Sequence, residues 1–359
     1  MNRSRRTSIA TLSLALTLAA LAAMPAGPAL RGDEQADALA KYRQPVDAAI
    51  DAALAYLAKA QLADGAFPGG MPKSTAVTSL AVMAFLAKGH SPGCGPYGEV
   101  IDKGIDQVLA HQQTNGYLVA KDGANGPMYS HCIATLMLSE VSGMVSPDRQ
   151  KRLDPALAKA LKLILTAQQV KKPPKMQGGW RYQHSSPDSD ISCSGWAMMA
   201  LRSARNAGAA VPREAIDQAM TFFLNCRNPD GGFGYTPGGQ SGLARTGTGL
   251  LCLELSGRHR DDTTSGAGDW ILKNLPRNFG AEFFYYGLYY SSQGMFQLGQ
   301  KHWDRWGEHM YQMMLKFQQK DGSWPAGTAS EAPAGPCYST AMAVLAMSVS
   351  YRQLPIYQR

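Results

Sequence analysis

A motif that returns about every 50 residues is the feature of this sequence that most constrains its fold. In each copy a helical pattern ends in Gln or Asn, an Asp-Gly, Asn-Gly or Gly-Gly turn follows, and an aromatic residue and a second, more apolar pattern come next. The turn glycines of five copies are Gly65, Gly116, Gly179, Gly231 and Gly322. Because the last gap equals about two periods, we expect a sixth copy without the turn motif near residues 264–298.

Every copy contains two helical patterns of different character. The first has apolar residues at helical spacing with charged residues between them, which is typical of a helix with one face in solvent. The segments with this outer pattern are 46–60, 99–113, 154–169, 213–226 and 302–319. The second pattern is apolar on all sides and rich in Ala, Met and Leu, as expected of a helix enclosed by others. The segments with this inner pattern are 74–87, 129–142, 191–207, 243–256 and 338–351.

Alternating outer and inner helices predict an all-α (α/α)6 fold, a ring of six helical hairpins. A polar residue near the start of each inner segment is a candidate N-cap. These candidates are Ser74, Thr75, Ser130, Asp190, Ser192, Thr246, Ser339 and Thr340. Since the inner helices run in one direction, their N-termini gather at one mouth, where their partial positive charges favour an anion. Met, Leu and aromatic residues inside the ring suit a hydrophobic chain.

The N-terminal residues differ from the repeats and indicate an export signal. Arg3, Arg5 and Arg6 precede an apolar run at 9–21, and small residues and prolines follow it. The run is too short for a typical membrane-spanning helix. We therefore expect an exported protein, periplasmic or extracellular, with a signal peptide at 1–29, a linker at 30–45 and a single ring domain at 46–359.

Charge and cysteine spacing argue against two classes of protein. The formal net charge of +8 falls to +5 without the three N-terminal arginines, and the basic residues form no stripe, so nucleic acid is not an expected partner. The six cysteines are scattered and include no Cys-x-x-Cys pair, which argues against a zinc ribbon or a thiol redox motif. Export would permit disulfides, but the spacing does not determine their pairing.

The turn motifs, followed by inner segments that open with Ser or Thr, resemble the prenyltransferase and squalene cyclase repeat superfamily. The likeness covers nearly the whole predicted mature chain. Several strings more closely resemble exported bacterial single-toroid proteins of that superfamily. These strings begin at Gly95, Met128, Gly178, Ser194, Tyr285, Trp303 and Tyr351. The resemblance implies an α/α toroid, but the single-toroid subgroup implies no particular reaction.

The resemblance also implies one candidate acid. An acidic segment at 187–190 precedes the third inner helix, where squalene-type cyclases carry a motif whose protonated middle aspartate starts polyene cyclisation. The matching residue is Asp190, and Asp188 or His131 is the candidate neighbour that keeps it protonated. Because Ile191 stands at the third acidic position, the alternative is that Asp190 only caps a helix. A further alternative makes Asp188 and Asp190 the acid and base of a glycan-processing toroid.

We expect no cofactor, with zinc as the alternative. Protein prenyltransferases of the superfamily bind zinc through Asp, Cys and His, and His131, Cys132 and Cys193 are expected near Asp190 at the same mouth. The Asp-Gly-Cys sequence of those enzymes ends here in Ser323. Cys and His at the start of a buried helix are more commonly packing residues than ligands.

Aromatic and basic residues near the mouth are the candidate ligand-binding groups. Aromatic rings can stabilise a carbocation by about 0.5–2 kcal/mol each, and arginines can hold a diphosphate. The candidates are Tyr129, Trp180, Arg181, Tyr182, Trp196, Arg245, Tyr285, Tyr286 and Tyr338. Two functions stay open: an exported terpene cyclase-like enzyme, and a toroid without catalytic activity that binds a lipid, peptide or glycan. The expected partner is a hydrophobic small molecule or an exported protein or glycan, and a peripheral membrane contact is a further option.

Overall fold

The computed structural model describes residues 33–69, 74–120, 126–281, 283–328 and 331–357, so the predicted signal peptide lies outside the described residues. Twelve α-helices occur in these segments, and strand pairing among them is limited to isolated bridges. The helices are α1 (Asp33–Ala60), α2 (Thr75–Ala87), α3 (Gly98–Ala110), α4 (Pro127–Val141), α5 (Pro147–Gln168), α6 (Ile191–Asn206), α7 (Arg213–Asn225), α8 (Leu243–Leu255), α9 (Asp262–Lys273), α10 (Phe284–Leu298), α11 (Gln300–Phe317) and α12 (Gly335–Met347).

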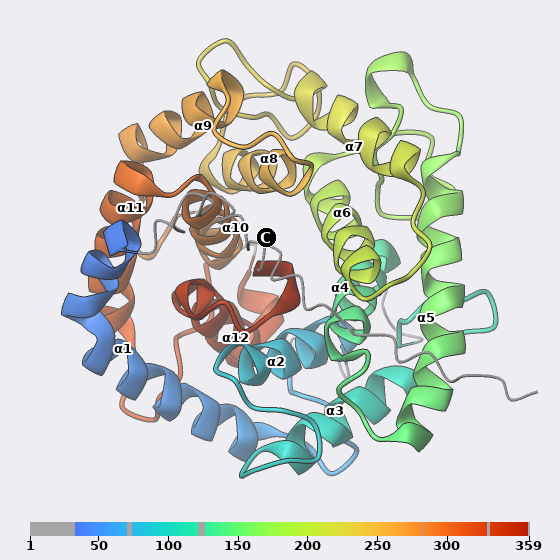
Figure 1. Cartoon of the computed structure of the whole chain (residues 1–359), viewed down its shortest axis with the longest axis vertical. Helices are drawn as coiled ribbons and strands as arrows, with labels where there is room; N and C mark the ends of the chain where they lie inside the picture. Colours follow the sequence, from blue (N-terminus) through green and yellow to red (C-terminus); the bar gives the residue numbers. More distant parts are fainter. Residues whose placement is uncertain (1–32, 70–73, 121–125, 282, 329–330, 358–359) are drawn as a thin grey trace, which may run out of the picture.

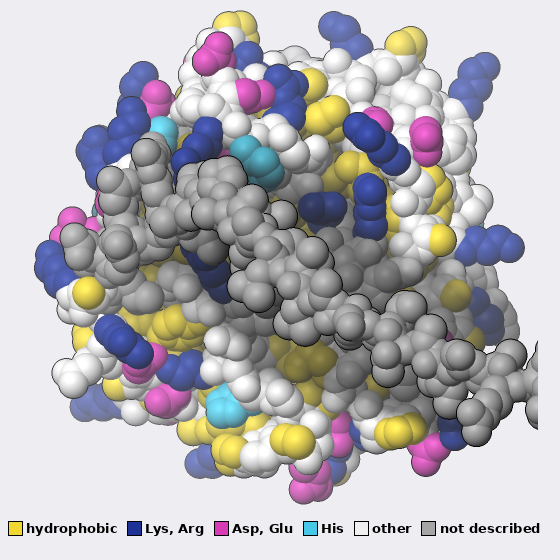
Figure 2. Space-filling view, viewed as in Figure 1, with side chains coloured by type: hydrophobic (Ala, Val, Ile, Leu, Met, Phe, Trp, Pro, Cys, Tyr) yellow, Lys and Arg dark blue, Asp and Glu magenta, His cyan; other side chains and the backbone are white. Residues whose placement is uncertain are grey.

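The helices form two concentric rings, with the odd-numbered helices outside and the even-numbered helices inside (Figure 1). The predicted (α/α)6 architecture is therefore confirmed. The repeat without a turn motif supplies the hairpin α9–α10, where the sequence predicted it. On the face shown in Figure 2, Lys and Arg side chains are interspersed with Asp and Glu. No helix in the described part of the chain has the length and apolar character needed to cross a membrane.

The first helix begins earlier than the sequence pattern predicted. We expected a linker to residue 45 and a helix from 46, but α1 begins at Asp33 and runs through Pro45. Proline removes one backbone hydrogen bond inside a helix. Pro45 and Lys41, whose carbonyl loses that bond, are both exposed, so water can solvate the carbonyl.

A glutamine in four repeats ties each outer helix to the next one. Its side-chain Nε2 donates to the carbonyl of the turn glycine or its neighbour in the same repeat and to a carbonyl of the following outer helix. The four residues and their outer-helix acceptors are Gln61 to Val100, Gln112 to Ala156, Gln168 to Ala215 and Gln318 to Ala49. The last of these bonds, 2.7 Å long, joins the α11 end to α1 and so closes the ring.

The turns need glycine because their backbone is left-handed and lies against the next outer helix. In the third repeat Gly178, rather than the neighbouring Gly179, has this conformation, with φ +90°. An added Cβ there would lie 2.2 Å from the backbone oxygen of Gln218 in α7. Any side chain would therefore push the turn away from the ring.

Two of the eight predicted N-cap residues cap a helix through their side chains. Of the candidates, Ser74 and Asp190 accept bonds from first-turn backbone N–H groups, and Thr75 and Ser192 lie in the turns that these two cap. The others, Ser130, Thr246, Ser339 and Thr340, lie inside helices that begin earlier, beside Gly or Pro. In five of the repeats, a side chain near the start of the inner helix instead accepts the backbone N–H of a loop residue, at 2.8–3.2 Å. These pairs are Thr78 with Phe67, His131 with Leu118, Ser194 with Trp180, Thr246 with Phe233 and Thr340 with Trp324.

The C-terminal segment closes the ring at the ends of the inner helices opposite the mouth. Leu354 and Ile356 are buried, and the backbone N–H of Ile356 donates to Glu140 near the end of α4 at 3.2 Å. The interior is therefore accessible mainly from the mouth.

Candidate functional site

A cavity of about 1140 Å³ lies at the mouth where the inner helices begin. Each inner helix contributes a residue from its start to the wall, namely Ser74, Tyr129, Ser192, Arg245, Tyr286 and Tyr338. Leu80, Ile133 and Trp196 line the cavity from deeper turns of their helices. The cavity thus combines an apolar floor with six converging helix N-termini.

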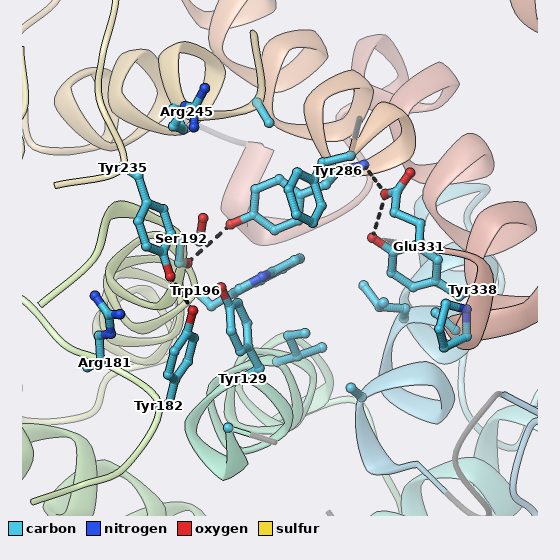
Figure 3. A pocket seen from close by; sticks show the side chains of 18 of the residues that line it. Tyr129, Arg181, Tyr182, Ser192, Trp196, Tyr235, Arg245, Tyr286, Glu331 and Tyr338 are labelled. Carbon is cyan, nitrogen blue, oxygen red and sulfur yellow. Dashed lines mark hydrogen bonds between the residues drawn. The ribbon is translucent and has the colours of Figure 1, made fainter. Parts of the chain in front are cut away.

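Aromatic side chains make up much of the wall (Figure 3). Tyr286 crosses from α10 toward α6, where its hydroxyl donates to the backbone oxygen of Ser192 at 3.2 Å. The Tyr286 ring meets Trp196 edge to face, with centroids 6.2 Å apart. Tyr129 lies on the neighbouring helix α4. Five of the predicted aromatic residues, these three together with Tyr182 and Tyr338, therefore line one cavity.

Arg181 lies on one side of the cavity between two tyrosine rings. Its guanidinium carbon is 4.7 Å from the centroid of Tyr182 and 5.4 Å from that of Tyr235. The hydroxyls of these tyrosines hydrogen-bond to each other. The rings hold the guanidinium in place by cation–π attraction, so Arg181 is positioned before any ligand arrives.

Asp190 divides its two carboxylate oxygens between two environments. Oδ1 accepts the backbone N–H groups of Ser192 and Cys193 at 2.9 and 2.8 Å, which makes Asp190 the N-cap of α6. Oδ2 is buried with no hydrogen-bond partner among the described residues, and Arg181 Nε lies 3.7 Å away. Burial raises the pKa of Asp190 to about 6, although the backbone donors and Arg181 oppose the shift.

The two predicted supports of Asp190 lie in different surroundings. Asp188 is at the cavity wall, 44% exposed, and its Oδ2 is 3.4 Å from Arg181 Nη1. His131 is fully buried between backbone groups: Nδ1 accepts from Leu118 N–H and Nε2 lies 3.2 Å from the oxygen of Ala160. Burial lowers the pKa of His131 to about 4, so it is a neutral structural residue. No contact joins it to Asp190.

The residues considered for zinc do not form a ligand set. Among the described residues, no three His, Cys, Asp or Glu side chains are placed to hold a metal ion. Both nitrogens of His131 face backbone groups, and burial raises the pKa of the Cys132 and Cys193 thiols, which disfavours thiolate ligands. All six cysteines lie in described segments and none is in a disulfide.

Two predicted ligand-binding residues belong to the core. Trp180 is buried and donates from Nε1 to the oxygen of Ile164, and Tyr285 donates to the oxygen of Pro325. Neither lines the cavity. Their positions in the repeat explain this, because Trp180 is the loop aromatic that seals a hairpin and Tyr285 lies one residue from the inward-facing Tyr286.

Sequence reasoning missed several cavity residues, among them Tyr235 and Glu331. Tyr235 follows Gly232 at the same distance as Tyr182 follows Gly179, so aligning the repeats would have found it. Glu331 has no motif. Its carboxylate accepts from the backbone N–H groups of Tyr285 and Tyr286 and from the Tyr338 hydroxyl at 3.0–3.2 Å, so it caps α10 from another part of the chain.

Arg245 is the cavity cation without a counter-ion. It is the third residue of α8, where the helix dipole disfavours positive charge, and no ion pair or hydrogen bond neutralises it within the described segments. Gly242 makes room for it, since an added Cβ there would lie 2.3 Å from Arg245 Nη2. Arg245 and Arg181 lie on the same side of the cavity, with Tyr235 between them (Figure 3).

Comparison with known families agrees with this architecture. Residues 35–280 match the family described as the prenyltransferase alpha-alpha toroid domain. The chain belongs to this family. The toroid has no significant match among curated proteins.

Solved structures share the same fold at low sequence identity. A variant of the type II terpene cyclase MstE from Scytonema, in complex with geranylgeranyl dihydroxybenzoate, is 13% identical with a TM-score of 0.57, covering 88% of this chain and 100% of its own. A glycosidase variant in complex with glucose is 13% identical with a TM-score of 0.55, covering 86% and 98%. At this identity the likenesses establish the toroid fold, which cyclases and glycosidases share.

Proposed function

We propose that this toroid is an exported protein that binds an amphipathic small molecule in the mouth cavity, with the anionic group of the ligand held by Arg245 and Arg181, which lie on the same side of the cavity. The observation that carries the proposal is the guanidinium of Arg245 in the cavity wall, which has no ion-pair or hydrogen-bond partner among the residues that the structure describes. A ligand anion would supply its counter-ion and would also meet the positive ends of the inner helices. Such a ligand would offset the unfavourable interaction of Arg245 with the dipole of α8.

The rest of the cavity suits the apolar part of the ligand. Its volume of about 1140 Å³ is large enough for an extended hydrocarbon chain, since small-molecule pockets commonly measure about 300–1,000 Å³. Leu80, Ile133 and Trp196 offer apolar contact on the floor, and Tyr129 and Tyr286 add ring faces. An isoprenoid or another lipid with an anionic head group fits this pattern.

Export and a membrane source of the ligand form part of this proposal. The basic residues and apolar run within 1–29 support export. Tyr182 and Phe283, which are 38% and 43% exposed, lie at the edge of the cavity, where they suit a peripheral contact with a lipid surface. A ligand could then pass from the membrane to the cavity.

Calorimetry with two ligands of equal chain length tests the proposal. We expect wild type to bind decanesulfonate more tightly than uncharged decanol, and Arg245→Gln to weaken decanesulfonate binding by about 10- to 100-fold, because one charge-assisted contact is worth about 1.5–3 kcal/mol. Arg213→Gln is the matched control, since Arg213 lies on α7 with its side chain 80% exposed. Equal affinities in wild type and Arg245→Gln would refute the anion site.

Acid-initiated isoprenoid cyclisation is the second candidate, favoured by one observation. Asp190 Oδ2 is buried without a hydrogen-bond partner among the described residues, and burial raises its pKa to about 6, so a protonated form is accessible in mild acid. In such a reaction Asp190 would donate its proton to a terminal alkene, and the cation would lose a proton after ring closure. Arg181 beside the carboxylate opposes this chemistry.

Product analysis separates the two candidates. Wild type and Asp190→Asn would be incubated with geranylgeraniol at pH 5.5, and the extracts examined by gas chromatography with mass spectrometry. A cyclic isomer of unchanged mass, formed by wild type only, would establish cyclisation. Unchanged geranylgeraniol recovered from both proteins would leave Asp190 as a helix cap and the toroid as a binding protein.

A further inference from the structure

The arrangement of Arg181 and Asp190 links the cavity to a buried carboxylate. Arg181 is an ion-pair partner of Asp188 and Asp190, at 3.4 and 3.7 Å, but these distances are too long for good hydrogen bonds. The guanidinium lines the cavity, whereas Asp190 is fully buried. Arg181 therefore has hydrogen-bond donors to offer a ligand while its charge stabilises the Asp190 carboxylate from the same place.

A ligand anion at Arg181 would change the electrostatic balance at Asp190. The anion would offset the positive charge that now favours ionised Asp190, and it would add a negative charge near a carboxylate in a low-dielectric site. Oδ2 has no hydrogen bond among the described residues that would be lost when it binds a proton. The cap would survive, because it uses Oδ1.

We infer that anion binding at Arg181 is coupled to proton uptake by Asp190, so that the cavity takes up its ligand together with a proton. The inference rests on the proposed function, since it requires an anionic ligand in this cavity. By reciprocity, protonation of Asp190 strengthens anion binding. Each unit by which binding raises the pKa of Asp190 corresponds to about a tenfold difference in affinity between high and low pH.

The tyrosines and cysteines near Asp190 do not compete for this proton. Asp188 shares the Arg181 guanidinium with Asp190. The other titratable side chains that face Asp190 are tyrosines and cysteines on α4, α6 and α10 and in the segment that follows α7. They are Tyr129, Cys193, Cys226, Tyr286 and Tyr235. Burial raises the pKa of every one of them further above neutrality, so they stay protonated near pH 6. Because Asp188 and Glu331 also line the cavity, the comparison of wild type with Asp190→Asn assigns the change in bound protons to Asp190.

Titration calorimetry at pH 6.5 in two buffers of different ionisation enthalpy measures the linkage. The probe is decanesulfonate, whose sulfonate stays ionised, so that any proton is taken up by the protein. We expect wild type to bind roughly half a proton or more per ligand. We also expect its affinity to rise as the pH falls from 8 to 5.5.

Three variants give the test its controls. Asp190→Asn retains a side-chain oxygen for the cap and should bind without proton uptake and with little dependence on pH. Arg181→Gln should also lose the uptake. Asp217→Asn removes an exposed carboxylate on α7, outside the cavity, and should behave as wild type. Circular dichroism would confirm that each variant is folded.

The outcomes distinguish this inference from the proposed function. Binding of decanesulfonate without proton uptake in wild type, or equal uptake in wild type and Asp190→Asn, would overturn the coupling and leave the anion-binding proposal standing. A complete lack of decanesulfonate binding would overturn both. Uptake in wild type that disappears in Asp190→Asn and Arg181→Gln would establish the coupling.

Discussion

At the scale of the residue, Asp190 serves two purposes with two oxygens. One oxygen caps α6 and the other faces Arg181 from a site without solvent. Capping accounts for an aspartate at this position. It does not account for the burial of the second oxygen, which has no hydrogen bond within the described part of the chain and therefore has a cost in stability. Buried polar groups of this kind are more common at functional sites than elsewhere.

This cost predicts a pH dependence of stability. The pKa of Asp190 is about 6 in the folded protein and near 3.8 when unperturbed, so its contribution to stability falls as pH rises through 6. Asp190→Asn should therefore increase the free energy of unfolding at pH 8 by about 2–3 kcal/mol. Urea unfolding of both proteins at pH 8 and at pH 4 measures this, and the two should converge at pH 4. A variant that is less stable than wild type at pH 8 would show that the ionised carboxylate stabilises the fold.

His131 shows how repeats reveal the role of a single residue. It occupies the position that Thr78, Ser194 and Thr246 occupy in other copies, and like them it accepts a backbone N–H from its loop. Its chemistry as a base or ligand is therefore not used. Its predicted place at the mouth of the ring suggested a catalytic role. Comparison with the same position in the other repeats shows that His131 holds its loop against the inner helix.

At the scale of the element, the turn between outer and inner helix decides how hairpins pack. The left-handed glycine allows the loop to lie against the following outer helix, and the glutamine holds it there. These contacts join sequential repeats, so each hairpin is held by the next rather than by its own turn alone.

Substitutions at two glycines with the same φ can distinguish the energetic cost of backbone strain from the cost of a packing clash. Gly178 and Gly208 both have φ +90°, but an added Cβ meets Gln218 at 2.2 Å in the first case and nothing within 4 Å in the second. We expect Gly208→Ala to cost about 1–2 kcal/mol from strain alone. Gly178→Ala should cost about 1–3 kcal/mol more, because the clash is added. Chemical denaturation of the two variants tests this, and equal losses would contradict the packing role of the turn.

At the scale of the whole molecule, closure of the ring requires both ends of the chain. Gln318 bonds to α1, and the C-terminal segment covers the interior at the end opposite the mouth. Glu140 binds that segment through Ile356 N–H and also accepts from the Ser203 hydroxyl of α6. One buried carboxylate thus connects α4, α6 and the end of the chain.

The contribution of Glu140 to the stability of the closed ring should depend on pH. Burial raises the pKa of Glu140 to about 7, above its ordinary 4.5, so its contribution to stability declines as pH rises through 7. Glu140→Gln keeps an acceptor for Ile356 and a group that can bond Ser203, and should melt at a higher temperature than wild type at pH 8.5 but not at pH 5. Calorimetric melting at both pH values measures this. A lower melting temperature at pH 8.5 would mean that the ionised group is needed.

The cavity could be predicted from the sequence only in part. The repeat placed Tyr129, Arg181, Arg245 and Tyr286 near the helix N-termini, and they do line the cavity. It could not distinguish Tyr285 from Tyr286, because adjacent helical residues differ in direction by a rotation that depends on where the helix begins. Glu331 could not be predicted at all, since it caps a helix distant from it in sequence.

The sequence by itself determined the architecture, because an apolar pattern repeated about every 50 residues can bury its inner helices only by closing into a ring. It also determined which helix ends meet at the mouth. Only the tertiary structure decided which side chains face the cavity and which charges are left without partners. Periodicity specifies the packing of an element. The charge balance of a buried site depends instead on contacts between residues far apart in the chain. Arg181 packs against the ring of Tyr235, whereas Arg245 has no counter-ion among the described residues.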